Sequence, residues 1–127
     1  AHVNSQAALK SYTNVHNHGS VEVASPHKLV DMLFEGALQR IAQAKGAMQF
    51  GNVELKGHKI NRAVAIVGGL RESLNKDDGG DIANNLDALY VYIQNVLYSA
   101  HAKNDIAQLD EATKLLLELR SAWNQIG

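Results

Sequence analysis

Histidines and carboxylates are the side chains with which this chain could do chemistry, and their spacing gives little support for a reaction centre. Glu54 and His58 lie one helical turn apart and could share a metal contact. No second Glu-His pair accompanies them, so a solvated pair is the favoured interpretation. The spacing of the remaining histidines brings them to no common centre; these are His2, His16, His18, His27 and His101.

Two further patterns resemble known sites but lack a required residue. Three carboxylates cluster at Asp77, Asp78 and Asp81, but a calcium loop would need a bidentate Glu where Ala88 stands. The LKG run at 55–57 is similar to the motif of histidine phosphotransfer domains, but Val53 occupies the phosphoacceptor position. No phosphate-cradling glycine loop or nucleophile elbow is present. We therefore expect neither an enzyme nor a bound metal or cofactor.

Composition favours a helical protein and gives no sign of a nucleic-acid partner. Hydrophobic residues make up 46% of the 127 residues, aromatic residues only 6%, and Pro26 is the single proline. The formal charge of −1 offers no basic field for nucleic acid. No apolar stretch approaches the ~20 residues that span a bilayer, and the first residues do not form a signal peptide. The absence of cysteine is compatible with a reducing cytosol. Because neither a signal peptide nor a membrane span is recognised, we expect a soluble protein of the cytoplasm.

Helix signals divide the chain into an arm, residues 1–24, and a single domain, residues 25–127. Ser25 and Pro26 are typical of a helix start, and Asp105 is a second N-cap. Gly79 and Gly80 can end one helix, and Asp81 can cap the next. The predicted helices begin near residues 26, 53, 81 and 106, and the second extends to about residue 75. Because their connections are short, we expect an all-α, antiparallel up-down-up-down four-helix bundle.

Apolar stripes with helical spacing predict which residues form the core of this bundle. In the second helix, three glycines are expected to mark close helix crossings or a bend: Gly57, Gly68 and Gly69. The expected inward residues are, in the first helix, Leu29, Leu33, Ala37, Arg40, Ile41, Ala44 and Met48; in the second, Ile60, Ala63, Val64, Val67, Leu70 and Leu74; in the third, Ile82, Leu86, Leu89, Ile93, Val96 and Ala100; and in the fourth, Leu109, Ala112, Leu116, Leu119, Trp123 and Ile126.

Some apolar residues fall outside these stripes. At 100° per residue, Leu117 points away from the core, and so do Val91 and Tyr98; Tyr90 and Tyr92 lie on the flanks of their helix. Exposed apolar residues are common, so ordinary surface residues are one interpretation. The other is a groove that accepts an amphipathic or extended partner. The arm could cover such a strip through Tyr12, Val15, Val21 and Val23.

The chain resembles the FliS family of flagellar secretion chaperones. Three segments carry the resemblance: ASPHKLVDMLFEGALQRIAQAKGAM at 24–48, GGDIANNLDALYVYI at 79–93, and LDEATKLLLELRSAW at 109–123. Their order and spacing cover nearly everything after residue 24. The resemblance implies a four-helix bundle, and an N-terminal arm with a tyrosine, matched by Tyr12, that covers part of the binding surface when the client is absent. The stretch between Tyr12 and Ala24 is longer than is common in the family.

The resemblance also implies a function: binding the disordered C-terminal segment of flagellin, preventing premature polymerisation, and aiding delivery to the flagellar type III export gate. For Leu86 and Ile60 a plain core position is the favoured alternative, and for Arg71 a snorkelling side chain. Other hypotheses for the chain are a phosphorelay or metal-binding bundle and a self-associating structural bundle. The candidate partner contacts are Leu86, Tyr90, Val91, Tyr98, Leu117, Ile60 and Arg71.

Overall fold

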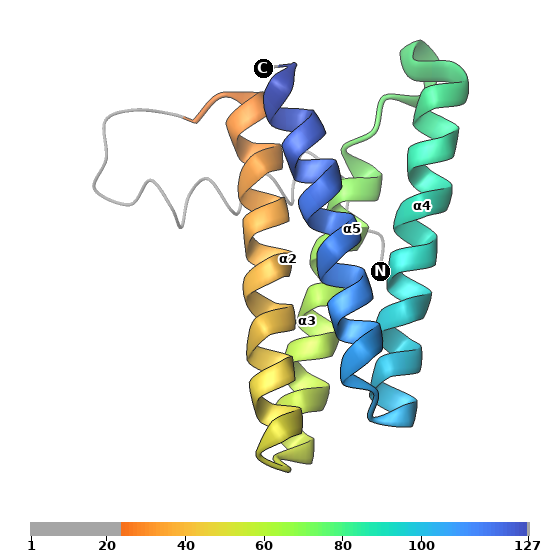
Figure 1. The fold of residues 1–127 in the computed structure, drawn as a ribbon. Helices are drawn as coiled ribbons and strands as arrows, with labels where there is room; N and C mark the ends of the chain where they lie inside the picture. The colour runs from red at the N-terminus through yellow and green to blue at the C-terminus, as the bar shows by residue number, and fades with distance from the viewer. Residues whose placement is uncertain (1–23, 127) are drawn as a thin grey trace.

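The structure is a computed structural model, and it describes residues 24–126 of the chain. Within that range all regular secondary structure is helical, in four helices: α2 (Pro26–Gln49), α3 (Val53–Glu72), α4 (Lys76–Lys103) and α5 (Ile106–Gln125). Successive helices run in opposite directions (Figure 1), so the predicted up-down-up-down bundle is confirmed. The described range contains no helix that is both long enough and apolar enough to cross a membrane.

Polar side chains start two of the helices at the positions that the sequence predicts. The Ser25 hydroxyl accepts a hydrogen bond from the Lys28 amide at 3.1 Å, with Pro26 in the first turn. The Asp105 carboxylate accepts from the Ala107 amide at 2.9 Å. These caps satisfy amides that have no partner within their own helix. They fix where α2 and α5 begin, and so set which side chains face the core.

The connection between α3 and α4 differs from the prediction. Helix α3 ends at Glu72 rather than near residue 75, and the Asn75 side chain, not Asp81, caps α4 by accepting from the Asp78 amide at 3.2 Å. One helical turn then precedes a kink at Gly80, where φ is 53° and ψ is −128°. Glycine adopts this conformation readily because it has no Cβ. The predicted break at Gly80 is therefore present, but inside α4.

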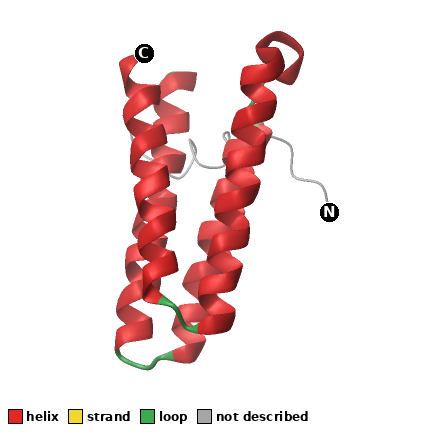
Figure 2. Cartoon of the chain, turned by 45° about the vertical axis from the view of Figure 1, so that its right-hand side comes forward, coloured by secondary structure: helices red, strands yellow, loops and turns green. Residues whose placement is uncertain are grey.

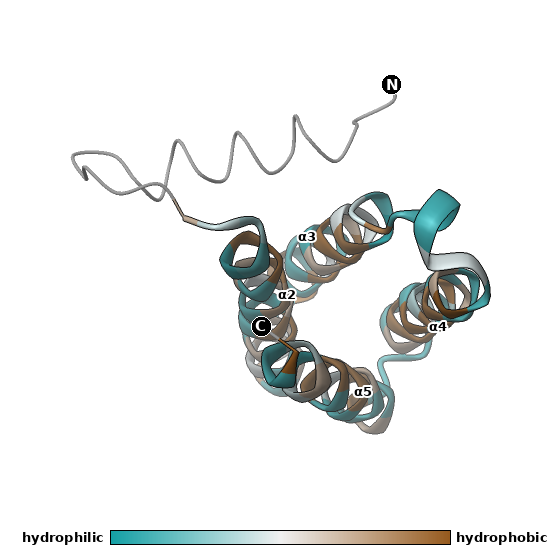
Figure 3. Cartoon of the chain, turned by 90° about the horizontal axis from the view of Figure 1, so that it is seen from above, coloured by the Kyte–Doolittle hydropathy of each residue, from teal (hydrophilic) through white to brown (hydrophobic). Residues whose placement is uncertain are grey.

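The core lies between the four helices, and their hydrophobic sides face one another (Figure 3). The predicted stripes are confirmed over most of their length. The prediction of burial is wrong for two residues: Ile82 is 73% exposed and Ile126 is 76% exposed. Ile126 follows the last residue of α5, and on α4 the adjacent Ala83, 4% exposed, is buried in place of Ile82. The buried residues at the centre include Phe34, Ile41, Ile60, Leu70, Ile93, Leu97, Leu109 and Leu116.

Each helix packs against the next one in the chain, and α5 closes the bundle against α2. Helices α2 and α3 have the most extensive contact. Leu33 of α2 lies within van der Waals contact distance of the position that a Cβ on Gly69 would occupy. Gly57 likewise lies against His101 of α4. Gly68 lies against Gln94 of α4 in the same way, so the expectation that these glycines mark close crossings is confirmed at all three positions.

Candidate partner-binding surface

The predicted contact residues differ widely in exposure. Tyr98 is 52% exposed and Leu117 is 50% exposed, so both face water as expected. Val91 and Leu86 are half-buried, and Leu86 packs against the core. These residues therefore do not form one evenly exposed strip.

Two predicted contact residues lie in the core. Ile60 has no exposed surface, and Tyr90 is 5% exposed. The sequence places Tyr90 on a flank of its helix, but its ring packs against Phe34 with centroids 6.4 Å apart. Burial raises the pKa of the Tyr90 hydroxyl to about 12. The prediction that Ile60 and Tyr90 are exposed to a partner is therefore wrong for this structure, because both belong to the core.

Arg71 joins α3 to α4 through polar contacts. Its guanidinium donates to both carboxylate oxygens of Asp87, at 2.8 and 3.5 Å, and to the Gln94 side chain at 3.3 Å. The hydrogen bond from Arg71, and next the one from Lys76, hold the pKa of Asp87 below its usual range. Arg71 thus has a carboxylate partner within its own chain, where the sequence favoured a snorkelling side chain.

Tyr98 and Val91 lie on the side of α4 that faces α3. Asp87 bonds Arg71, the Gln94 amide donates to the Val64 carbonyl at 3.1 Å, and His101 contacts Gly57. Val91 and Tyr98 alternate with these three α4 residues at helical spacings of three and four. We call Val91, Gln94, Tyr98 and His101, with Gly57 and Gly68 of α3, the α3–α4 face.

Leu117 lies on a different side of the bundle. On α5, Asp110 pairs with Lys45 at 2.9 Å and Arg120 pairs with Asp31 at 2.8 Å, so this side of α5 faces α2. Leu117 is seven residues after Asp110 and three before Arg120, and therefore shares that side. Within residues 24–126, α2 packs against α3 and α5 but not against α4. The α2–α5 side is thus opposite the α3–α4 face.

Tyr92 occupies a third side. Its hydroxyl donates to the Glu111 carboxylate, and Ser99 donates to Gln108 at 3.0 Å, so both lie between α4 and α5. The apolar strip that the sequence suggests is therefore divided among three sides of the bundle. Periodicity within one helix does not reveal which neighbour lies beside each residue.

The arm residues Tyr12, Val15, Val21 and Val23 lie outside the described residues. Within the described range, no group of three or more His, Cys, Asp or Glu residues is arranged to hold a metal ion. Sequence reasoning missed two buried charges, Asp31 and Lys56, and each is 5% exposed. For Lys56, the available signal was its position four residues before Ile60, in line with the core stripe.

Comparison with known proteins gives consistent matches over most of the chain. Residues 8–127 match the family described as flagellar protein FliS. The flagellar secretion chaperone FliS of Vibrio cholerae is 43% identical over 121 residues, which cover 95% of this chain and 89% of that protein. The flagellar secretion chaperone FliSB of Pseudomonas aeruginosa is 44% identical over 120 residues, covering 94% and 95%. The FliS of Salmonella typhimurium is 36% identical over 122 residues, covering 95% and 90%.

Proposed function

Because the chain belongs to the FliS family, we propose that it is a cytoplasmic export chaperone for flagellin. In this proposal it binds the disordered C-terminal segment of flagellin, prevents premature polymerisation and aids delivery to the flagellar type III export gate. The function needs a surface that holds an apolar segment, and no catalytic step.

The observation that carries the proposal is the exposure of Tyr98 and Leu117. The core closes around other side chains, so about half of each of these residues remains in water. A client that covered them would bury apolar area, which stabilises a complex by ~25 cal/mol per Å² before the cost of ordering the client is subtracted. Val91, half-buried two turns before Tyr98 on the same side of α4, extends the same surface.

The placement of these residues constrains how a client binds. Tyr98 and Leu117 lie on opposite sides of the bundle, so one straight helix cannot contact both. A disordered segment can instead follow the surface from one side to the other and gain helix where it packs. Such wrapping would hide the polymerising face of flagellin. The contact of Leu86 with the core makes it a contributor at the edge of this path.

We further propose that the arm covers part of this surface when flagellin is absent. Tyr12, Val15, Val21 and Val23 supply the apolar side chains that such a cover needs. An intramolecular cover competes with the client, so removing residues 1–23 is expected to tighten client binding.

Calorimetry tests the proposal directly. The full chain is titrated with a peptide that carries the C-terminal segment of flagellin from the same organism, and with flagellin that lacks that segment. The proposal predicts a one-to-one complex with the peptide and none with the truncated flagellin. Absence of heat and of co-elution with the peptide, while the chain is folded, would reject it. Light scattering of the chain alone checks for self-association.

A further inference from the structure

The α2–α3 and α4–α5 connections lie at the same end of the bundle (Figure 2). Lys56 carries a buried positive charge at this end, where it shares a pocket with Asn52 and Asn104. Its ammonium donates to the His101 carbonyl at 3.2 Å and to the Asn104 side-chain oxygen at 3.0 Å. An ammonium has three N–H donors. Within residues 24–126, Lys56 forms no ion pair and its third N–H has no acceptor. A buried cation is stabilised when an anion completes its contacts.

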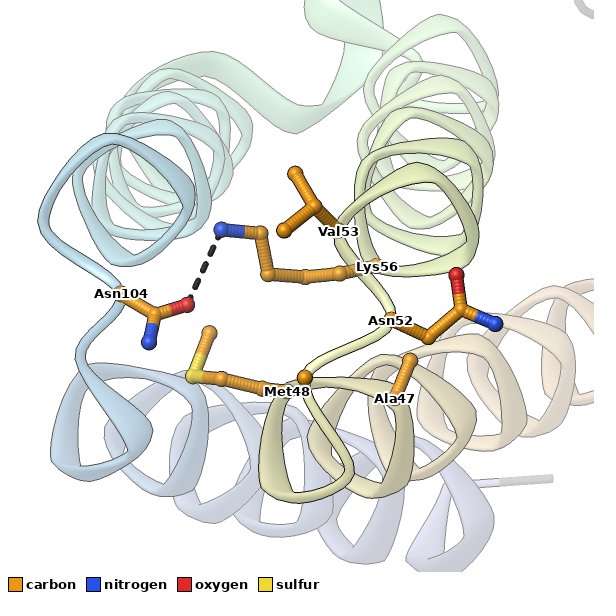
Figure 4. A pocket seen from close by; sticks show the side chains of 7 residues that line it. Ala47, Met48, Asn52, Val53, Lys56 and Asn104 are labelled. Carbon is orange, nitrogen blue, oxygen red and sulfur yellow. Dashed lines mark hydrogen bonds between the residues drawn. The ribbon is translucent and has the colours of Figure 1, made fainter.

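A pocket of about 200 Å³ lies beside this ammonium. The side chains of Met48 and Val53 form apolar walls, and Lys56 extends between them toward Asn104 (Figure 4). A cavity of ~150 Å³ is large enough for a benzene ring. The pocket therefore has room for an apolar side chain, and one cationic donor is available beside it.

We propose that this pocket binds the C-terminal carboxylate of the client, with the side chain of the client's last residue against Met48 and Val53. A chain terminus carries an anion and an apolar side chain on the same residue, and this pocket offers a partner to each. The inference rests on the proposed function, because in that proposal the bound segment is the C-terminal end of flagellin.

One hydrogen bond links Lys56, which lines the pocket, to the last residue of the α3–α4 face, His101. His101 lies one turn after Tyr98, packs against Gly57, and its carbonyl accepts the bond from Lys56. A client on Tyr98 would therefore lie about one turn of α4 from the carbonyl that Lys56 bonds. Phe50, 90% exposed, and Val53, 67% exposed, add apolar area at the same end of the bundle.

Another role for Lys56 is to stabilise the C-terminus of α4, where a cation interacts favourably with the helix dipole. If that were its only role, the affinity for the client would not depend on whether the client ends in a carboxylate or an amide. The two roles are separated by changing the client rather than the protein, which leaves the folding of the chain untouched.

The experiment compares two client peptides by calorimetry with the full chain, one ending in a free carboxylate and one in a C-terminal amide. We expect the amide to bind about tenfold more weakly, the effect of one charge-assisted hydrogen bond. Equal affinities would overturn the inference and leave the chaperone function standing. Failure of both peptides to bind would overturn both.

Variants of the chain identify the group responsible. In Lys56→Met the acid and the amide should bind equally, whereas Lys59→Met, one turn away and outside the pocket lining, should keep the tenfold difference. Val53→Asp places a negative charge at the exposed rim, and should weaken the acid more than the amide even if Lys56→Met does not fold. A tenfold difference that persists in folded Lys56→Met, or an equal loss for both peptides in Val53→Asp, would contradict the inference.

Discussion

The imidazole of His27 stacks on the indole of Trp123, with ring centroids 4.7 Å apart and planes 8° from parallel. The Trp123 indole N–H donates to the His27 carbonyl at 3.0 Å, and His27 Nε2 lies 2.9 Å from the Trp123 carbonyl oxygen. The pair therefore joins the start of α2 to the end of α5. The Asp31–Arg120 ion pair lies one turn further into the bundle on the same two helices.

The first prediction concerns this pair. Trp123→Phe keeps an aromatic ring but removes the N–H, and should lower the free energy of unfolding by about 1 kcal/mol. His27→Ala removes the stacking and should have an effect of similar size. Urea unfolding of both variants and of the double variant measures their coupling. Strictly additive losses would show that the two residues act independently.

The second prediction concerns acid. The hydrogen bond from Arg120 is the main cause that lowers the pKa of Asp31 to about 2, while burial acts in the opposite direction. In the unfolded chain this pKa is ~3.9. The lowered value stabilises the fold above pH ~4, by about 2 kcal/mol, and this contribution disappears as the pH falls from ~4 to ~2.

Asp31→Asn tests this contribution because it removes the titrating group. Urea unfolding at pH 7, 4, 3 and 2 should show a smaller loss of stability on acidification for the variant than for the natural sequence. The difference between the two chains should narrow below pH 4. Parallel losses over the whole range would mean that other carboxylates, such as Asp87, dominate the acid response.

The third prediction compares two adjacent leucines. Leu117 is 50% exposed, so Leu117→Asp should change the free energy of unfolding by less than about 1 kcal/mol and weaken binding of the flagellin peptide. Leu116 has no exposed surface, and Leu116→Ala should lower the free energy of unfolding by about 2–5 kcal/mol. Thermal melts and calorimetry measure both effects. A large loss of stability in Leu117→Asp would show that Leu117 is part of the core.

The fourth prediction compares two glycines near the α2–α3 connection. Gly51 has a φ of 72°, so Gly51→Ala should destabilise the fold by about 1 kcal/mol. Gly46 is helical, and nothing lies within 4 Å of an added Cβ, so Gly46→Ala should stabilise it by about 0.5–1 kcal/mol. Urea unfolding should therefore give opposite signs. If both variants changed the free energy of unfolding in the same direction, this account of the two backbone conformations would be contradicted.

Local signals in the sequence determined the helices and most of the core. The starts at Ser25 and Asp105 follow from side chains that cap their own helix, which is an interaction over a few residues. The apolar stripes likewise depend only on the geometry of one helix. These features predicted the fold class and the exposure of Tyr98 and Leu117 without knowledge of any neighbour.

The tertiary structure decided what each side chain meets. A stripe gives a direction around one helix axis, but burial needs another helix in that direction. On α4 the buried side includes Ala83 and Tyr90 but not Ile82, so it is offset from the predicted stripe, and the Tyr90 ring packs against Phe34. For the same reason, only the packing order of the helices showed that Tyr98 and Leu117 lie on opposite sides, and that Lys56 meets the end of α4.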